Sequence, residues 1–395
     1  MVFAPVCGYF GDRYNRKLIM QSGLIIWTLS VLLSTFCSPA HFYLFMLCRG
    51  IVGIGEASFA TVAPTIIADM FEGNQRSTAL MVFYFAIPIG SGLGFISGAT
   101  ISLWTGVWQW GVRLTSILGV ISFLLLYHAV EEPVRSVIDD SSSEESYFFE
   151  DVKYLLTVPT FITTTIGLTA VVFMTGCVAW WAPTLMEHAW AVQHSTSHVS
   201  NEIKARIGLV FGLITCLAGF VGVLGGSALS QMWRSGFRIL PKNLHADPHV
   251  CALGAFLAIP FLYLALVLSP NYTAISLVFT FLGTTCCCMN WAVNMDILMY
   301  VVSLRRRSIA SATQTLISHL FGDASSPYIV GLISDRIREV TGNERSVIAN
   351  FIALQRSLFV PNFVLCLGGF MYLVSTFYID QDKENADRLT IGTFM

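Results

Sequence analysis

Long apolar runs are the feature that most constrains what this chain can fold into. A helix needs about 20 mostly apolar residues to cross the hydrocarbon core of a membrane, and stretches of that length recur between clusters of charge along the whole sequence. The runs are continuous and lack the alternation of membrane β-strands. The sequence therefore predicts an all-α polytopic membrane protein with ten spans, at 18–37, 41–70, 75–103, 111–130, 158–186, 207–232, 250–269, 272–302, 309–334 and 351–379.

The scarcity of charge supports this prediction and excludes other classes. Only 12% of the 395 residues are charged, against roughly 25% in a soluble domain. A soluble fold of this size could not cover its surface with so few charges. A soluble domain, a nucleic-acid binder, a disordered chain and a disulfide scaffold are therefore all poor interpretations.

The basic residues indicate an orientation, because loops on the cytosolic side carry an excess of Lys and Arg. When the loops are assigned to alternate sides, most of the 22 basic residues fall on one face. We expect that face to be cytosolic, together with the C-terminus. Its members are Arg13, Arg16, Lys17, Arg76, Arg135, Lys153, Arg234, Arg238, Lys242, Arg305, Arg306, Arg307, Lys383 and Arg388.

One segment divides the chain. Residues 131–157 are acidic and contain a serine run, which is typical of a solvated linker. Four predicted spans precede it and six follow, whereas transporter folds built from repeats have equal halves. The apolar residues 1–9 resemble the last turns of a helix whose beginning is missing, so we expect an N-terminally truncated chain. The predicted parts are an N-terminal half (1–130), the acidic cytosolic linker (131–157), a C-terminal half (158–380) and a cytosolic tail (381–395).

The first loop carries a specific motif. It has a glycine, three residues, Asp-Arg, two residues and two basic positions: Gly8, Asp12, Arg13, Arg16 and Lys17. Gly8 would let two helices approach closely, and Asp12 can lie against a helix N-terminus. The loop resembles the signature loop between helices 2 and 3 of the major facilitator superfamily, which implies a gating latch that breaks and reforms as two halves rock. The alternative is an ordinary basic cytosolic loop.

Three further segments resemble the spinster family of that superfamily. They are Arg49-Gly50-Ile51-Val52-Gly53-Ile54-Gly55-Glu56-Ala57, Asn290-Trp291-Ala292 with Asp296-Ile297-Leu298, and Ser318-His319-Leu320-Phe321-Gly322-Asp323-Ala324 with Ser326-Pro327-Tyr328. The resemblance implies a major facilitator fold that lacks helix 1 and most of helix 2. It also implies the family's activities, which are export of sphingosine-1-phosphate or movement of lysophospholipids, with proton coupling in some members.

Charged residues inside the spans are the candidates for transport, since charge at membrane depth normally faces a partner or a watery cavity. Arg49 and Glu56 lie seven positions apart, on one side of a helix. The guanidinium of Arg49 can hold a phosphate through two parallel bonds, and Glu56 is a candidate for substrate binding and for proton coupling. The alternative is a permanent Arg49–Glu56 ion pair that orients the helix.

Polar residues in the second half complete the candidate site. Asn290 and Asn294 share one helix face, whereas Asp296 points elsewhere. His319 and Asp323 share another face, with His319 as a substrate-binding residue and Asp323 as a second proton-coupling residue. All four can instead be hydrogen-bonding groups that hold helices together.

The predicted function is secondary active transport of an amphipathic lipid by alternating access. Coupling of this transport to protons is an additional hypothesis. No enzyme motif, metal site, cofactor site or nucleic-acid site is evident. The partners are then the lipid substrate, the bilayer and protons, in the plasma membrane or an endolysosomal membrane. The alternative is a truncated, non-transporting isoform that modulates a full-length transporter.

Overall fold

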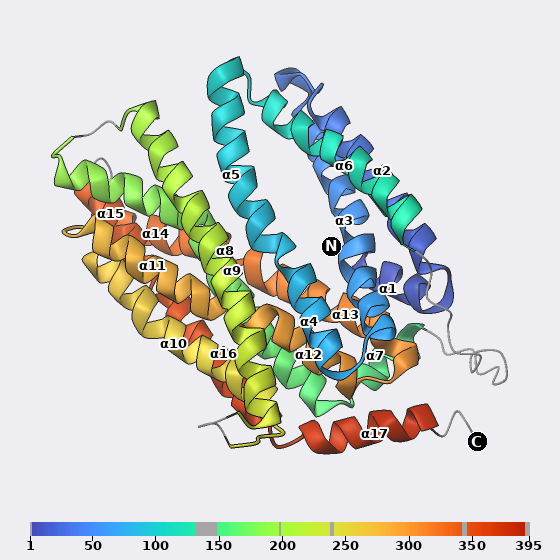
Figure 1. Cartoon of the computed structure of the whole chain (residues 1–395). Coiled ribbons are helices and arrows are strands. Elements are labelled where there is room, and N and C mark those ends of the chain that lie inside the picture. Colours follow the sequence, from blue (N-terminus) through green and yellow to red (C-terminus); the bar gives the residue numbers. More distant parts are fainter. Residues whose placement is uncertain (1, 131–147, 197–198, 238–240, 342–345, 392–395) are drawn as a thin grey trace.

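The computed structural model describes residues 2–130, 148–196, 199–237, 241–341 and 346–391, and every regular element in these ranges is helical. Figure 1 shows the helices running side by side in an elongated bundle, with α7 and α17 at its lower end. The N-terminal helices are α1 (Ala4–Arg13), α2 (Arg16–Ser34), α3 (Phe42–Met70), α4 (Gly73–Tyr84), α5 (Ala86–Thr105) and α6 (Gln109–Ala129), with the short η1 (Pro39–His41) before α3.

The C-terminal helices form the larger group. They are α8 (Pro159–Gln193), α9 (Asn201–Ser235), α10 (Ala246–Leu268), α11 (Thr273–Cys288), α12 (Asn290–Val301), η3 (Leu304–Arg306), α13 (Arg307–Ser318), the π-helical turn η4 (His319–Asp323), α14 (Ser326–Thr341), α15 (Val347–Ser357) and α16 (Val360–Ser375). The chain between the two groups ends in the short helix α7 (Phe148–Leu155), and α17 (Ile379–Ile391) follows the last long helix.

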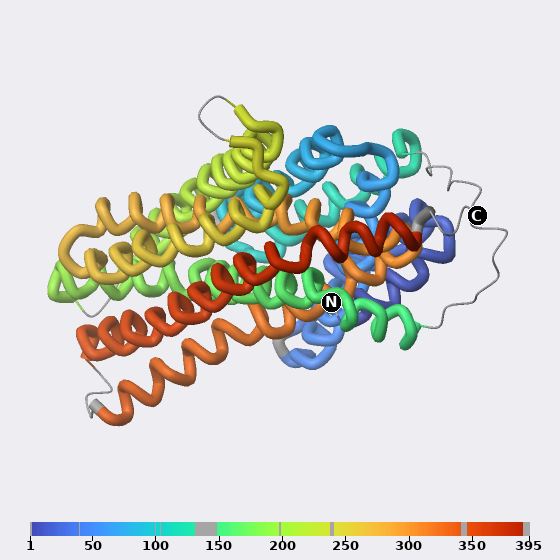
Figure 2. The backbone as a smooth tube through the Cα atoms, turned by 90° about the horizontal axis from the view of Figure 1, so that it is seen from below, coloured from blue at the N-terminus to red at the C-terminus, as the bar shows by residue number. Residues whose placement is uncertain are grey.

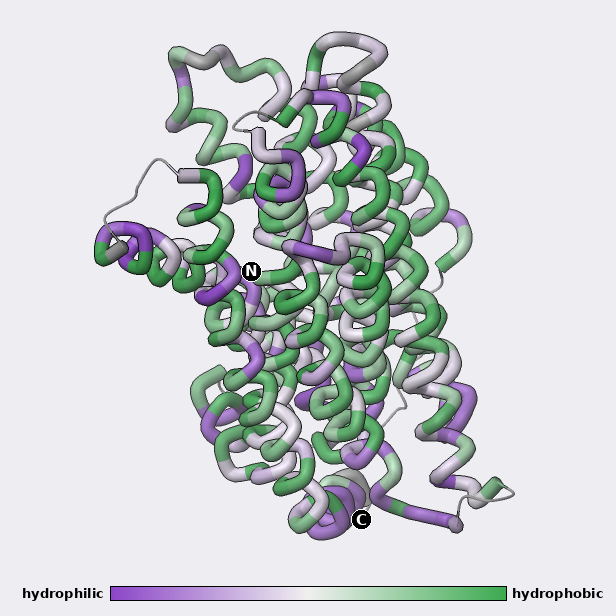
Figure 3. Tube along the Cα trace, turned by 90° about the vertical axis from the view of Figure 1, so that its left-hand side faces the viewer, coloured by the Kyte–Doolittle hydropathy of each residue, from purple (hydrophilic) through white to green (hydrophobic). Residues whose placement is uncertain are grey.

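Length and composition make this a polytopic membrane fold. Within the described ranges, nine helices are long and apolar enough to cross a membrane. The remaining predicted span, 309–334, is also helical, but it is divided into α13, η4 and α14 and is not among the nine, three of which are also made of two consecutive helices (α4 with α5, α11 with α12, and α15 with α16). Its polar residues and its π turn explain the difference. Figure 3 shows apolar residues along the lengths of the helices and hydrophilic residues gathered on α17 and toward helix ends.

The apolar core lies mainly among the C-terminal helices. Its fully buried side chains include Phe161 of α8, Leu298 of α12 and Tyr372 of α16. By contrast, only 17% of the residues in the most apolar stretch of α6 are buried, against 50% in α8. The outer N-terminal helices therefore present most of their apolar surface to lipid.

The predicted linker and the predicted tail each contain a helix in the part that the structure describes. Residues 131–147 of the linker and 392–395 of the tail lie outside the described residues, but the remaining parts contain helices. Figure 2, seen from below, shows α7 and α17 on the end face of the bundle. Asp382 of α17 is buried and accepts a hydrogen bond of 2.8 Å from the backbone N–H of Thr160, in the first turn of α8. A carboxylate at that position caps the helix and fixes α17 against the bundle. We call this end of the molecule, with α1, α7 and α17, the polar end.

Candidate functional site

The site predicted on α3 has its two charged residues in place, but not as an ion pair. The Arg49 guanidinium lies 5.2 Å from the centre of the Phe45 ring, one turn away. Both Arg49 and Glu56 are partly exposed. In the described part of the chain no ion pair joins them. The arrangement thus leaves the guanidinium accessible to a ligand.

A histidine–carboxylate pair lies in the π turn η4. The Nδ1 of His319 lies 2.9 Å from an Asp323 carboxylate oxygen, and both side chains are more than a third exposed. Glu56 is close enough to act electrostatically on the imidazole. The fold therefore places Glu56 within electrostatic range of the His319–Asp323 pair, which comes from a distant part of the sequence. We call these three residues the central acidic site.

Asn290 and Asn294 lie elsewhere, buried among the C-terminal helices. Asn290 donates to the Cys287 carbonyl oxygen at 3.2 Å. Asn294 donates to Gln314 at 2.8 Å and accepts from the Tyr372 hydroxyl at 3.1 Å, so it joins α12 to α13 and α16. Both are almost fully buried. This geometry matches the helix-joining alternative more closely than an exposed substrate contact.

The signature loop lies at the polar end and contacts the C-terminal helices directly. The Asp12 carboxylate accepts hydrogen bonds from the backbone N–H groups of Ser308 and Ile309, at 3.0 and 2.9 Å. These amides are unpaired donors in the first turn of α13, where a negative charge is stabilising. A Cβ added at Gly8 would lie 2.6 Å from the Ala312 Cβ, so only glycine allows this approach of α1 to α13.

Burial changes the protonation of this capping group. It raises the pKa of Asp12 from 3.8 to about 6, although the hydrogen bonds from α13 and the charge of Arg16 lower it. Desolvation disfavours the charged form of a carboxyl group. The pKa of Asp12 is consequently about 6 while it is held against α13.

The basic residues of the loop extend the contact. Arg13 lies 3.2 Å from the Asp151 carboxylate of α7, and Arg306 lies 2.7 Å from the other oxygen of the same carboxylate. Asp151 is therefore a buried bridge between the two groups of helices. Arg16 pairs with Asp69 at the end of α3, which also pairs with Arg307. Lys17 donates to the Tyr127 carbonyl oxygen of α6 at 2.9 Å.

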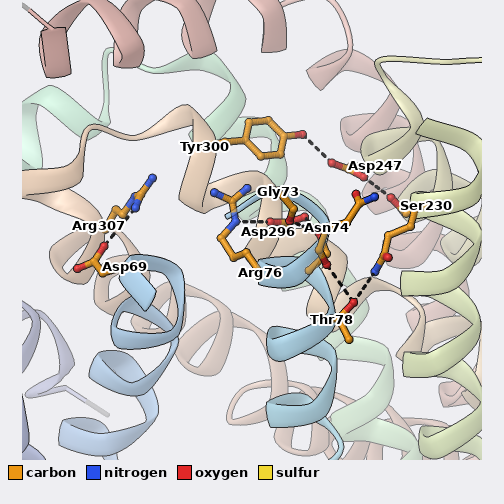
Figure 4. Close-up of polar contacts among 12 residues, drawn as sticks. Asp69, Gly73, Asn74, Arg76, Thr78, Ser230, Asp247, Asp296, Tyr300 and Arg307 are labelled. Atoms are coloured by element: carbon orange, nitrogen blue, oxygen red, sulfur yellow. Dashed lines mark hydrogen bonds and ion pairs between the residues drawn. The ribbon is translucent and has the colours of Figure 1, made fainter. Parts of the chain in front are cut away.

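A second charged network at the polar end was not predicted. Asp296 of α12 pairs with Arg76 of α4 at 2.7 Å and with Arg234 of α9 at 3.6 Å. Arg234 also pairs with Asp247, which accepts from the Tyr300 hydroxyl at 3.0 Å. Figure 4 shows Arg76 and Asp296 meeting beside Asp247 and Tyr300. The signal in the sequence was single charged residues at the ends of apolar runs, but their partners lie too far along the chain to be identified from spacing.

These features suit movement of a charged ligand better than covalent chemistry. Among the residues described, no group of three or more His, Cys, Asp and Glu side chains is placed to hold a metal ion. The central acidic site offers groups that exchange protons, and the polar end offers ion pairs that can separate. The ion pairs and hydrogen bonds at the polar end join the two groups of helices in this structure.

Comparisons with known proteins show what this chain is similar to. The family model for the Major Facilitator Superfamily matches residues 1–327. Protein spinster homolog 1 of Xenopus tropicalis is 43% identical over 396 residues, covering 99% of this chain and 74% of the relative. The human protein of the same name is 43% identical over 392 residues, with 98% and 73% covered. A sphingosine-1-phosphate transporter of Xenopus tropicalis is 38% identical over 390 residues, with 98% and 74% covered.

Solved structures show the same fold. The crystal structure of a bacterial homologue of the human lysosomal transporter spinster, inward-facing and unoccupied, matches with a TM-score of 0.66 at 19% identity, covering 96% of this chain and 87% of the other. A major facilitator transporter, FucP, in the outward conformation matches with a TM-score of 0.62 at 12% identity, with 95% and 86% covered.

Proposed function

The chain belongs to the major facilitator superfamily and, within it, to the spinster family, and from this premise we propose that it transports an amphipathic lipid by alternating access. The proposed substrate is sphingosine-1-phosphate or a lysophospholipid, and the proposed driving ion is the proton. A relative named as a sphingosine-1-phosphate transporter supports the substrate class.

The observation that carries the proposal is an accessible arginine, Arg49, on the same helix as Glu56 of the central acidic site. A guanidinium binds a phosphate headgroup through paired hydrogen bonds, and Arg49 has no carboxylate partner in the described chain. Glu56, His319 and Asp323 supply groups that can take up and release a proton. Asn290 and Asn294 remain proposed substrate contacts, reached only when the C-terminal helices rearrange.

The gate of the proposed cycle is the polar end. We propose that Gly8, Asp12, Arg13, Arg16 and Lys17 hold this end shut and separate from their partners when it opens. The proposal assigns the polar end and the C-terminus to the cytosol, following the distribution of basic residues. It places the protein in the plasma membrane or an endolysosomal membrane, with halves at 1–130 and 158–380.

Transport into proteoliposomes tests the assignment. Labelled sphingosine-1-phosphate and lysophospholipids are followed with and without a pH gradient, and recovered lipid is checked by mass spectrometry. We expect an unchanged lipid, loss of transport in Arg49→Ala, and loss of the gradient response in Glu56→Gln.

The matched controls are Arg336→Ala and Glu339→Gln. These two residues form an exposed pair on α14, and such a pair contributes little to stability, so both variants keep transport. Normal transport by Arg49→Ala would sink the headgroup role. A preserved gradient response in Glu56→Gln would refute the coupling role, and chemically altered lipid would indicate an enzyme.

A further inference from the structure

The turn that carries the His319–Asp323 pair has unusual backbone geometry. The backbone N–H of Ala324 donates to the His319 carbonyl oxygen at 3.0 Å, which is the i to i+5 bond of a π turn. Such turns are rare and widen the helix by one residue. A widened turn is held in place only if its surroundings fix it, so the packing around η4 determines where the Asp323 carboxylate lies.

Two glycines fix the turn against α8. A Cβ added at Gly176 of α8 would lie 2.6 Å from the Asp323 Cα and 2.7 Å from its Cβ. On the opposite side of the contact, a Cβ added at Gly322 would lie 2.8 Å from Val172 Cγ1. The backbones of α8 and η4 therefore approach closely at two points, where Gly176 lies against Asp323 and Gly322 lies against Val172.

The start of α14, which follows η4, is also in contact with α8. The indole N–H of Trp181 donates to the Pro327 carbonyl oxygen at 2.9 Å, and Gly331 packs against the same indole ring. Because η4 and the start of α14 are both attached to α8, the backbone of Asp323 has little freedom. Its side chain remains partly exposed beside His319.

We propose that Gly176 is a positioning residue, which sets the distance between the Asp323 carboxylate and the His319 imidazole. This inference rests on the proton-coupled transport proposed above. The carboxylates that act on His319 are Asp323 from its own turn and Glu56 from α3. Of the two, only Asp323 is held by Gly176.

The test substitutes alanine at the contact. A methyl group at Gly176 must push Asp323 back by about 1 Å to reach an ordinary carbon–carbon separation. A protonated imidazole that loses its carboxylate partner binds its proton less tightly. We expect the midpoint of the transport pH profile to fall by about 1 unit in Gly176→Ala. Gly322→Ala is expected to shift it in the same direction by less, since Val172 can partly move aside. It serves as the second variant if Gly176→Ala does not fold.

Two matched controls separate positioning from general packing. Gly368→Ala creates an equally close contact with α8, at 2.6 Å from the Ala170 Cβ, but away from η4. Gly225→Ala on α9 meets nothing within 4 Å. Both are expected to keep the wild-type midpoint. A wild-type midpoint in folded Gly176→Ala and Gly322→Ala would overturn the inference, and so would an equal shift in Gly368→Ala.

A second readout separates this inference from the proposed function. The titration of His319 is followed by NMR in the histidine-labelled protein in nanodiscs, assigned by its disappearance in His319→Gln. If transport has no pH dependence but the His319 titration shifts in Gly176→Ala, the positioning role holds and proton coupling fails. If transport loses its pH dependence in His319→Gln and the titration is unchanged in Gly176→Ala, proton coupling holds and the positioning role fails.

Discussion

Acidification is expected to close the polar end through Asp12. While Asp12 lies against α13 its pKa is about 6, and its ordinary value is 3.8. We assume that opening this end exposes Asp12 to water and restores the ordinary value. The closed conformation then binds the proton more tightly than the open one, so protonation favours closure. This contribution to closure is complete below the ordinary pKa and is lost as the pH rises through about 6.

The magnitude follows from the two pKa values. At pH 7 both forms are almost fully ionised, and the proton contributes almost nothing. At pH 5 the closed form is mostly protonated and the open form is not, so the closed-to-open ratio rises about tenfold, or about 1.4 kcal/mol. Asp12→Asn resembles the protonated form, because its side chain keeps one acceptor for the two amides of α13. It should remove this pH dependence.

Distances across the polar end provide the assay. Spin labels at Glu72, before α4, and at Leu244, before α10, both lie at exposed positions. Double electron–electron resonance in nanodiscs at pH 7 and pH 5 then measures the fraction of closed molecules. Equal fractions at the two pH values in the wild type would refute the reasoning. The same response in Asp12→Asn would assign it to another group.

Two further predictions concern stability at the same end. Gly8→Ala places a methyl group 2.6 Å from the Ala312 Cβ and should lower the free energy of unfolding by about 1–3 kcal/mol. The measurement is the melting temperature in detergent. The control is Gly50→Ala, whose methyl group meets nothing within 4 Å and which should melt like the wild type. Asp296→Asn leaves Arg76 and Arg234 without their shared carboxylate and should cost about 3–5 kcal/mol. The exposed pair of Asp335 with Arg338 is the comparison, since Asp335→Asn should change stability by about 1 kcal/mol or less. Equal losses of stability in Asp296→Asn and Asp335→Asn would contradict the stabilising role of the buried Asp296 ion pairs.

The sequence predicted the features that depend on local composition. Apolar length located the spans, and the spacing of the first loop located a helix contact for Gly8 and a helix N-terminus for Asp12. Both contacts are present at α13. These contacts are predictable because the chemistry of each residue type limits its role. Glycine allows close helix packing, and a carboxylate at a helix N-terminus accepts hydrogen bonds from free backbone N–H groups.

Features that depend on distant partners could not be predicted. His319 and Asp323 are four residues apart, as in an ordinary α-helix, so nothing in their spacing indicates a π turn. The acidic segment around Asp382 has the composition of a solvated tail, and it is helical here against the first turn of α8. Asp296 was noted only as pointing away from Asn290, because its partner Arg76 is more than two hundred residues away in the sequence.

The bridge at Asp151 has a mechanical consequence. Its carboxylate is shared between an arginine from each group of helices, so separating those groups forces it to give up Arg13 or Arg306. The short helix α7 must then move with the half whose arginine stays paired with Asp151, and the ion pair to the other arginine is broken. The helix that connects the two groups in the sequence therefore moves as part of one of them.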